Sequence, residues 1–120
     1  MSRNERLIKA LKASAEPTRL RILALLRRGD LAVGEFVDIL DQSQPRLSHH
    51  LKTLSSAGLI DRLPEGSWVF YRLSQGEPSV ALLQTLFKAL DLNQPPYSLD
   101  RDALSKVRKD RSKAADRYFT

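Results

Sequence analysis

The stretch Ser43-Gln-Pro-Arg-Leu-Ser-His-His-Leu-Lys-Thr-Leu54 decides the fold that we predict for this chain. Ser43 can cap a helix, and Pro45 would lie in the first turn, where its missing N–H costs nothing. One face of the helix has the i, i+4, i+7 spacing of a buried stripe, through Leu47, Leu51 and Leu54. The opposite face carries hydroxyl, imidazole, guanidinium and ammonium groups without a carboxylate, which suits an anionic partner.

This polar face predicts a DNA recognition helix. In helix-turn-helix proteins the first turns of such a helix meet base edges in the major groove, where amide and guanidinium groups read the bases. The side chains that cluster there are Gln44, Arg46, Ser48 and His49. For Arg46 the alternative is a solvated side chain, but its place in the first turn favours contact with a base or a phosphate.

The neighbours His49 and His50 raise the question of a metal site. Adjacent residues diverge by about 100° around a helix, so one ion would hardly reach both rings, and no carboxylate lies one turn away. We therefore predict no metal here. His49 is predicted to contact DNA, and His50 to pack near Leu47 and Leu54.

The bulk composition is that of one basic globular domain. The chain has 120 residues, a formal net charge of +6 and no cysteine, so disulfides and thiolate metal sites are excluded. The charge suits double-stranded DNA, and a basic surface kept for solubility is the alternative. No apolar run approaches the roughly 20 residues that span a bilayer, and the first residues lack a signal-peptide pattern. We expect a cytoplasmic protein with no membrane partner.

Two helices are predicted at the start of the chain. The first runs from Glu5 to Ser14 and has an apolar side formed by Leu7, Ile8 and Leu11. The second starts at Glu16-Pro17-Thr18, with proline in its first turn, and ends at Gly29. Its apolar positions nearly encircle it, so we predict that it is the central core helix.

A third helix, from Leu31 to Leu40, precedes the recognition helix. The residues predicted to be buried on it are Val33, Phe36, Val37 and Leu40. Asp41-Gln42 makes a short polar connection to the next helix. The two helices and this connection form a helix-turn-helix unit.

Beyond Gly58 the pattern changes from helical to alternating, which predicts a β-hairpin. Its strands would be Leu59–Leu63 and Trp68–Leu73, joined by a turn over Pro64–Ser67. A hairpin directly after a recognition helix is the wing of a winged helix. The second strand divides its side chains between two faces, with Trp68, Phe70 and Arg72 on one and Val69, Tyr71 and Leu73 on the other. Trp68, Phe70 and Tyr71 would either pack the wing on the body or form a ligand pocket.

A further helix, from Gly76 to about Leu90, has more apolar surface than one subunit needs. We predict that it forms a homodimer interface with help from the first helix. The predicted interface residues are Leu7, Leu11, Val80, Leu83, Leu86, Phe87 and Leu90. The alternative is that this apolar face packs on its own domain.

The segment Asn93–Ser98 breaks regular structure and divides the chain. We predict a winged helix-turn-helix DNA-binding and dimerisation domain over residues 1–92, and a helical tail or connector over residues 93–120. The tail is helix-prone from Asp100 to Phe119, and its apolar stripe is thin. The predicted fold class is thus mainly α with a small β-hairpin, in a dimeric protein.

Several motifs together resemble the ArsR/SmtB family of bacterial repressors, over roughly Leu7 to Leu90. They are Ala15-Glu-Pro-Thr-Arg-Leu-Arg-Ile-Leu-Ala-Leu-Leu26, Val33-Gly-Glu-Phe36, the stretch from Ser43 to Leu54, Ala57-Gly-Leu-Ile60, Glu65-Gly66 and Tyr71-Arg-Leu73. The resemblance implies a dimeric winged helix-turn-helix repressor that binds a palindromic operator and leaves when an effector binds. DNA contacts are predicted for Ser43, Gln44, Arg46, Ser48, His49 and Lys52, with Arg62 and Ser67 near the wing.

The chain departs from the family's metal sensors at both of their sites. Metal-sensing members carry Cys-Val-Cys early in the third helix, where this chain has Ala32-Val33-Gly34. Another subgroup places Asp and His ligands along the dimer helix, where this chain has only Glu77 as a candidate ligand. We therefore predict no metal and no cofactor. The effector, if there is one, would be a small organic molecule or a metabolite that the sequence does not identify.

Two alternatives to a free-standing regulator stay open. The tail from Val107 to Phe119 resembles the connector of longer family members that carry an S-adenosylmethionine-dependent methyltransferase domain, so the chain would then be the DNA-binding module of a larger enzyme. The other alternative is a winged helix used only for protein contacts. The sequence has no glycine-rich phosphate loop, paired buried carboxylates or Ser/His/Asp set, so this chain is not predicted to be an enzyme.

Overall fold

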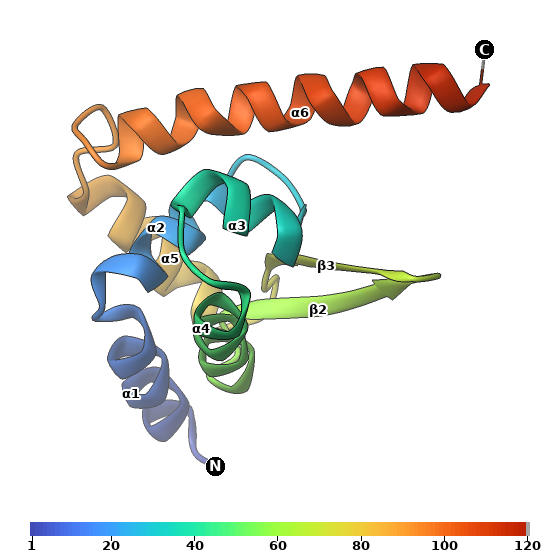
Figure 1. Ribbon diagram of the computed structural model, residues 1–120. Coiled ribbons are helices and arrows are strands. Elements are labelled where there is room, and N and C mark those ends of the chain that lie inside the picture. The colour runs from blue at the N-terminus through green and yellow to red at the C-terminus, as the bar shows by residue number, and fades with distance from the viewer. Residues whose placement is uncertain (120) are drawn as a thin grey trace.

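The computed structural model describes the backbone of residues 1–119 and the side chains of residues 1–113. Within these limits the chain forms six helices and three short strands (Figure 1). In chain order they are α1 Arg3–Ser14, α2 Pro17–Leu26, β1 Leu31–Ala32, α3 Val33–Leu40, α4 Gln44–Ser56, β2 Ile60–Glu65, β3 Trp68–Leu73, α5 Ser79–Ala89 and α6 Tyr97–Phe119. In the part of the chain described, no helix is both long and apolar enough to cross a bilayer.

Side-chain caps explain where the first helices and the recognition helix begin. Ser2 and Glu5 form a capping box, which starts α1 at Arg3, two residues earlier than predicted. Glu16 accepts a hydrogen bond from the backbone N–H of Arg19 at 2.8 Å and caps α2. Ser43 caps α4 in the same way, at 3.4 Å from the backbone nitrogen of Arg46. The predicted start of the recognition helix is therefore confirmed.

The predicted start of the third helix was wrong by two residues. Leu31 and Ala32 form the short strand β1 and pair with Tyr71 and Phe70 of β3, so α3 begins only at Val33. The side chain of Glu35 accepts a hydrogen bond from the backbone N–H of Ala32 at 2.9 Å, which caps the shortened helix. The strand β1 forms because the edge of β3 that is not paired with β2 is free to bind it. The local sequence around Leu31 cannot predict this pairing, because β3 lies about 40 residues farther along the chain.

The predicted hairpin forms, but β2 runs from Ile60 to Glu65, so Pro64 and Glu65 are paired with β3 and do not lie in the turn. The strand β1 joins the hairpin as a third strand. The strand order is β1-β3-β2, and both pairings are antiparallel. In the β2–β3 pairing Ile60 lies opposite Leu73 and Glu65 lies opposite Trp68. Gly66 in the turn has a φ of +60°, a conformation that glycine adopts without a steric penalty.

The core is built around the leucine stripe of α4. Leu47, Leu51 and Leu54 are fully buried, as predicted, together with Ile22 and Leu23 of α2. Other core residues come from α3, from the strands and from the turn before β2, among them Phe36, Leu31, Ile60 and Leu59. Because α4 is anchored along its whole length, its opposite face is held in a fixed direction toward solvent.

Helix α1 packs through small residues and leaves larger apolar ones outside. Ala10 and Ala13 are buried against the core, whereas Ile8 is 52% and Leu11 is 43% exposed. The apolar side predicted for this helix thus exists, but it faces away from the subunit's own core.

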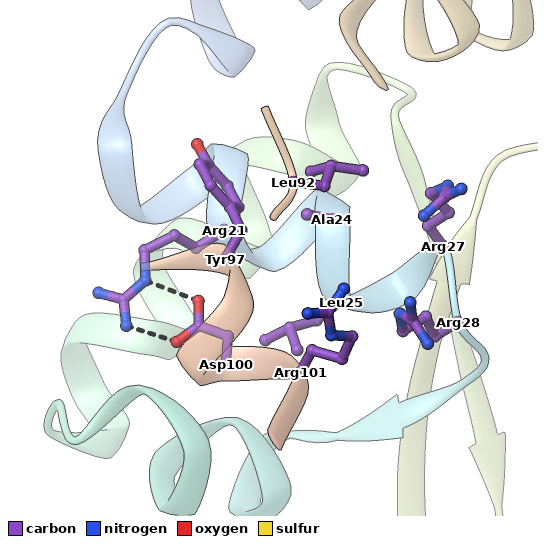
Figure 2. A pocket seen from close by; sticks show the side chains of 9 residues that line it. All are labelled: Arg21, Ala24, Leu25, Arg27, Arg28, Leu92, Tyr97, Asp100 and Arg101. Atoms are coloured by element: carbon purple, nitrogen blue, oxygen red, sulfur yellow. Dashed lines mark hydrogen bonds and ion pairs between the residues drawn. The ribbon is translucent and has the colours of Figure 1, made fainter. Parts of the chain in front are cut away.

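Helix α6 crosses α3 and packs on α2 and α3 (Figure 1). Figure 2 shows the ion pair that joins Arg21 of α2 to Asp100 of α6, with two hydrogen bonds of 2.9 and 2.8 Å. The hydrogen bond to Asp100 raises the pKa of the Arg21 guanidinium. Farther along, Arg108 donates to the carbonyl of Arg28, beside the turn at Gly29. Through Asp100 and Arg108, α6 is therefore bonded to residues of the first 92. The division of the chain into two domains at residue 92 stays a prediction.

Leu104→Ala should lower the free energy of unfolding by about 2–5 kcal/mol, because it empties a site in the core where the leucine side chain is 2% exposed. Urea unfolding followed by circular dichroism measures this loss. The matched control is Leu99→Ala, also on α6 but 62% exposed, which should cost less than about 0.5 kcal/mol. Equal effects of the two substitutions would mean that α6 is not anchored as described.

Candidate nucleic-acid interface

All eight residues predicted to contact DNA are exposed. Six of them lie on α4 or at its N-cap, and two lie on the hairpin: Ser43, Gln44, Arg46, Ser48, His49, Lys52, Arg62 and Ser67. The six from α4 form one surface because the leucine stripe fixes the opposite side of the helix. The hairpin extends away from α4 (Figure 1), so Arg62 and Ser67 belong to a second surface and not to the first.

The connection before α4 sets the direction in which the helix points. Asp41 has a left-handed backbone with a φ of +53°, which ends α3 abruptly. The side-chain amide of Gln42 then donates to the hydroxyl of Thr18 at 3.1 Å and ties the connection to α2. A short turn that is bonded to the core helix gives the helix-turn-helix unit a defined crossing geometry.

A cationic groove runs between α1 and α4 beside the predicted contacts. It has a volume of about 450 Å³, and its charged or titratable lining residues are Lys9, Lys12, Arg19, His49 and Lys52. No carboxylate lines it. Of the charged or titratable residues that line this groove, the prediction from sequence included only His49 and Lys52, both on α4. The sequence shows that Lys9 and Lys12 lie on a polar side of α1. It does not show that this side lies alongside the recognition helix, because that depends on how the two helices pack.

His50 is half-buried, and polar groups at the start of α2 contact its ring; its packing near Leu47 and Leu54 stays a prediction. Its Nδ1 lies 3.2 Å from Nη1 of Arg19 and 3.8 Å from Oε2 of Glu16. Arginine only donates, so the bond to Arg19 requires a neutral ring whose Nδ1 accepts, and this contact outweighs the longer one to Glu16. Burial lowers the pKa of His50 below its ordinary value of 6.5, with Glu16 opposing and Arg19 assisting.

Arg19 joins three helices at this point. Its Nε donates to the carbonyl of Ala13 at the end of α1 at 2.5 Å, and its Nη1 reaches His50 on α4. Glu16, the N-cap of α2, lies beside this junction. Burial alone would raise the pKa of its carboxyl, but hydrogen bonds from the backbone N–H groups of Arg19 and Thr18 lower that pKa by more, so it lies below its ordinary value of 4.5. The polar junction therefore fixes α1 against the recognition helix, which keeps the cationic groove in shape.

The residues predicted for a dimer interface divide into two sets. Leu11 is exposed, and the half-buried residues are Leu7, Val80, Leu86, Phe87 and Leu90. Leu83 is buried in the core of its own subunit. The α5 face is therefore shared: Leu83 is buried and Phe87 packs against the core, and the half-buried residues keep part of their apolar surface outside. The Arg27 guanidinium lies 5.9 Å from the centre of the Phe87 ring.

Among the described residues, no three His, Asp or Glu side chains form a group that could hold a metal ion. The whole sequence contains no cysteine. The chemistry of this surface is thus that of cations, amides and hydroxyls.

Comparisons with known proteins place the chain among bacterial regulators. Residues 16–62 match the model of the family described as bacterial regulatory protein, arsR family. The arsenical resistance operon repressor of Escherichia coli is 44% identical over 75 residues, which are 62% of this chain and 64% of the relative. The arsenic resistance transcriptional regulator ArsR1 of Pseudomonas putida is 41% identical over 98 residues, covering 80% of this chain and 75% of the relative.

A solved structure shares the fold. The homodimeric winged helix-turn-helix DNA-binding domain Mb0332 from Mycobacterium bovis superposes with a TM-score of 0.65 at 29% identity, over 74% of this chain and 82% of the other. The predicted winged helix-turn-helix fold is confirmed. The alternative of a module fused to a methyltransferase receives no support from these comparisons.

Lowering the pH from 7 to 5 should reduce stability, and His50→Gln should remove part of this loss. The pKa of His50 is lower in the folded protein than its ordinary value of 6.5. The neutral ring therefore stabilises the folded state above pH 6.5, and this contribution is lost as the pH falls toward the pKa of the folded state. Urea unfolding across this range measures the effect.

The control is His49→Gln on the exposed side of α4, which makes the same substitution at the neighbouring histidine without removing a group that Arg19 contacts. If His50→Gln showed the same slope of unfolding free energy against pH as the unsubstituted protein, His50 would not be the group responsible.

Proposed function

Because the chain belongs to the ArsR family of bacterial regulatory proteins, it is a winged helix-turn-helix transcriptional regulator that binds DNA, and we propose that it acts as a homodimeric repressor on a palindromic operator. One observation carries the proposal: an exposed, carboxylate-free face of α4 that is held by three fully buried leucines. This face has the shape and charge for the major groove of a duplex.

On the proposed operator each α4 enters a major groove, and the two helices of the dimer meet successive turns about 34 Å apart. Gln44, Arg46, Ser48 and His49 read bases from the first turns of the helix. Lys52 and the other cations of the groove between α1 and α4, Lys9, Lys12 and Arg19, neutralise phosphates. Arg62 and Ser67 contact the duplex from the wing. Each phosphate neutralised adds roughly 0.9 to the slope of log affinity against log salt concentration.

The proposed dimer interface combines α1 and α5, which lie on the side of the molecule away from the wing (Figure 1). Two observations support it. Ile8 and Leu11 expose large apolar side chains that the subunit itself does not cover, and the related domain Mb0332 is homodimeric. The proposed interface therefore uses these residues with Leu7, Val80, Leu86, Phe87 and Leu90, and Leu83 supports it from inside.

Any effector of this regulator would act without thiolate ligands. Two relatives are named for arsenic resistance, but this chain contains no cysteine to bind arsenic. A ligand held by carboxylates, aromatic rings or hydrogen bonds fits the side chains that are present.

Arg46→Ala should weaken binding to the operator by roughly 5- to 150-fold, the equivalent of about 1–3 kcal/mol for a lost bidentate base contact. The operator is obtained by selecting duplexes from a random pool with the purified protein, and fluorescence anisotropy measures affinity for it and for a random duplex. The loss should be larger on the operator. Equal losses would reassign Arg46 to a phosphate, and Lys109→Ala on α6 is the control expected to change neither.

Leu11→Glu should convert the dimer to a monomer at concentrations where the unsubstituted protein is dimeric, because association would bury a charge without a partner. Sedimentation velocity measures the change, and operator affinity should fall with it. Leu99→Glu, which also replaces an exposed leucine, should leave the dimer intact. A dimeric Leu11→Glu protein would remove α1 from the proposed interface.

A further inference from the structure

A cavity of about 330 Å³ lies between the wing, α3 and α6. This volume is within the range of small-molecule sites, about 300–1,000 Å³. The lining residues are Trp68 and Phe70 of β3, Glu35 and Asp38 of α3, and Val107, Asp110 and Arg111 of α6. The walls thus come from three elements that are far apart in the sequence. The cavity lies by the wing, whereas the proposed dimer interface uses α1 and α5 on the other side (Figure 1).

One wall of the cavity is aromatic and does not belong to the core cluster. The rings of Trp68 and Phe70 are stacked, with centres 6.2 Å apart and planes at 23°. They lie on the face of β3 opposite Tyr71 and Leu73, and it is Tyr71 and Leu73 that pack against the core. Trp68 is 61% exposed. A large aromatic surface is therefore left open toward the cavity and the solvent.

The other walls carry an excess of negative charge. Three carboxylates, Glu35, Asp38 and Asp110, face one guanidinium, Arg111. Arg111 donates to both oxygens of Glu35, and its guanidinium lies 5.8 Å from the centre of the Phe70 ring. Among the side chains described, neither Asp38 nor Asp110 has an ion-pair partner. The protein's own cation thus occupies part of a site made of carboxylates and an aromatic face, and the part beside Trp68 is left open.

We propose that this cavity is an effector site for a small organic cation with an aromatic or bulky apolar body. The cationic group lies between the aromatic wall and the carboxylates Asp38 and Asp110, where cation–π attraction and charge favour it over neutral or anionic molecules. The apolar body covers Trp68 and Val107.

The effector role rests on the proposed function. It is argued from the elements that line the cavity. One wall is the wing, which carries Arg62 and Ser67, and another is α3, the first helix of the helix-turn-helix unit. A ligand between them brings a second cation beside Arg111, whose contacts with Glu35 and Phe70 join α6 to α3 and the wing, and so changes how α6 holds the wing relative to α3. Ligand and DNA then prefer different positions of the wing, which couples the two binding events.

Trp68 is the only tryptophan in the chain, so its fluorescence reports ligand binding directly. The probe is benzyltrimethylammonium, titrated without DNA, and phenylacetate is the control of opposite charge. We expect a saturable change with the cation and none with phenylacetate. Asp38→Asn/Asp110→Asn should weaken binding of the cation at least about fivefold. Asp91→Asn/Asp102→Asn, which removes the same charge outside the cavity, should bind as the unsubstituted protein does.

Absence of a saturable change, equal binding of phenylacetate, or unchanged binding by Asp38→Asn/Asp110→Asn would overturn the site. Urea unfolding of both double variants shows that any loss of binding is not a loss of fold.

The effector role is tested on the selected operator by fluorescence anisotropy. Saturating benzyltrimethylammonium should lower operator affinity at least about fivefold in the unsubstituted protein, and much less in Asp38→Asn/Asp110→Asn. Probe binding that leaves operator affinity unchanged would overturn the effector role. The two proposals fail separately: a protein that binds DNA but not the probe refutes only the cavity proposal, and one that binds the probe but no duplex refutes the proposed function.

Discussion

The burial of three leucines on one side of α4 is the interaction on which the rest of the structure depends. Leu47, Leu51 and Leu54 are enclosed by α2, α3 and the strands, so the helix can neither rotate nor slide without exposing them. Each fully buried leucine contributes roughly 1.5–3 kcal/mol relative to an exposed one. The polar side of the same helix is consequently held toward solvent with little freedom, as a surface that reads a regular duplex requires.

A second layer of organisation is polar and lies at the junction of α1, α2 and α4. Arg19 contacts the end of α1 and His50 of α4, and Glu16 caps α2 while lying beside His50. These groups are only partly buried, so their bonds orient the helices more than they stabilise them. The orientation matters because it brings the lysines of α1 alongside the recognition helix, and so widens the cationic surface beyond α4 itself.

Helix α6 connects the body to the wing through charged groups. Its start is attached to α2 by the ion pair of the half-buried Arg21 with the buried Asp100, and Arg111 reaches both α3 and the aromatic face of β3. A partly buried ion pair adds little net stability, and here it joins the start of α6 to α2. The contact of Arg111 with Glu35 and Phe70 is more exposed than the ion pair of Arg21 and Asp100, and it lies beside the proposed site for a cationic ligand. The end of α6 near the wing is therefore more easily displaced than its start.

The sequence alone determined the elements whose signals are local. The cap at Ser43, the leucine spacing of α4, the Gly66 turn and the alternation of β3 each concern residues within a few positions of one another, and all of them formed as predicted. Only the tertiary structure decided the strand at Leu31–Ala32, the burial of Leu83, the outward side of α1, the ion pair between Arg21 and Asp100 and the groove shared by α1 and α4. The physical reason is that a periodic pattern shows that a face will be covered, whereas the covering element is chosen by packing between segments far apart in the chain.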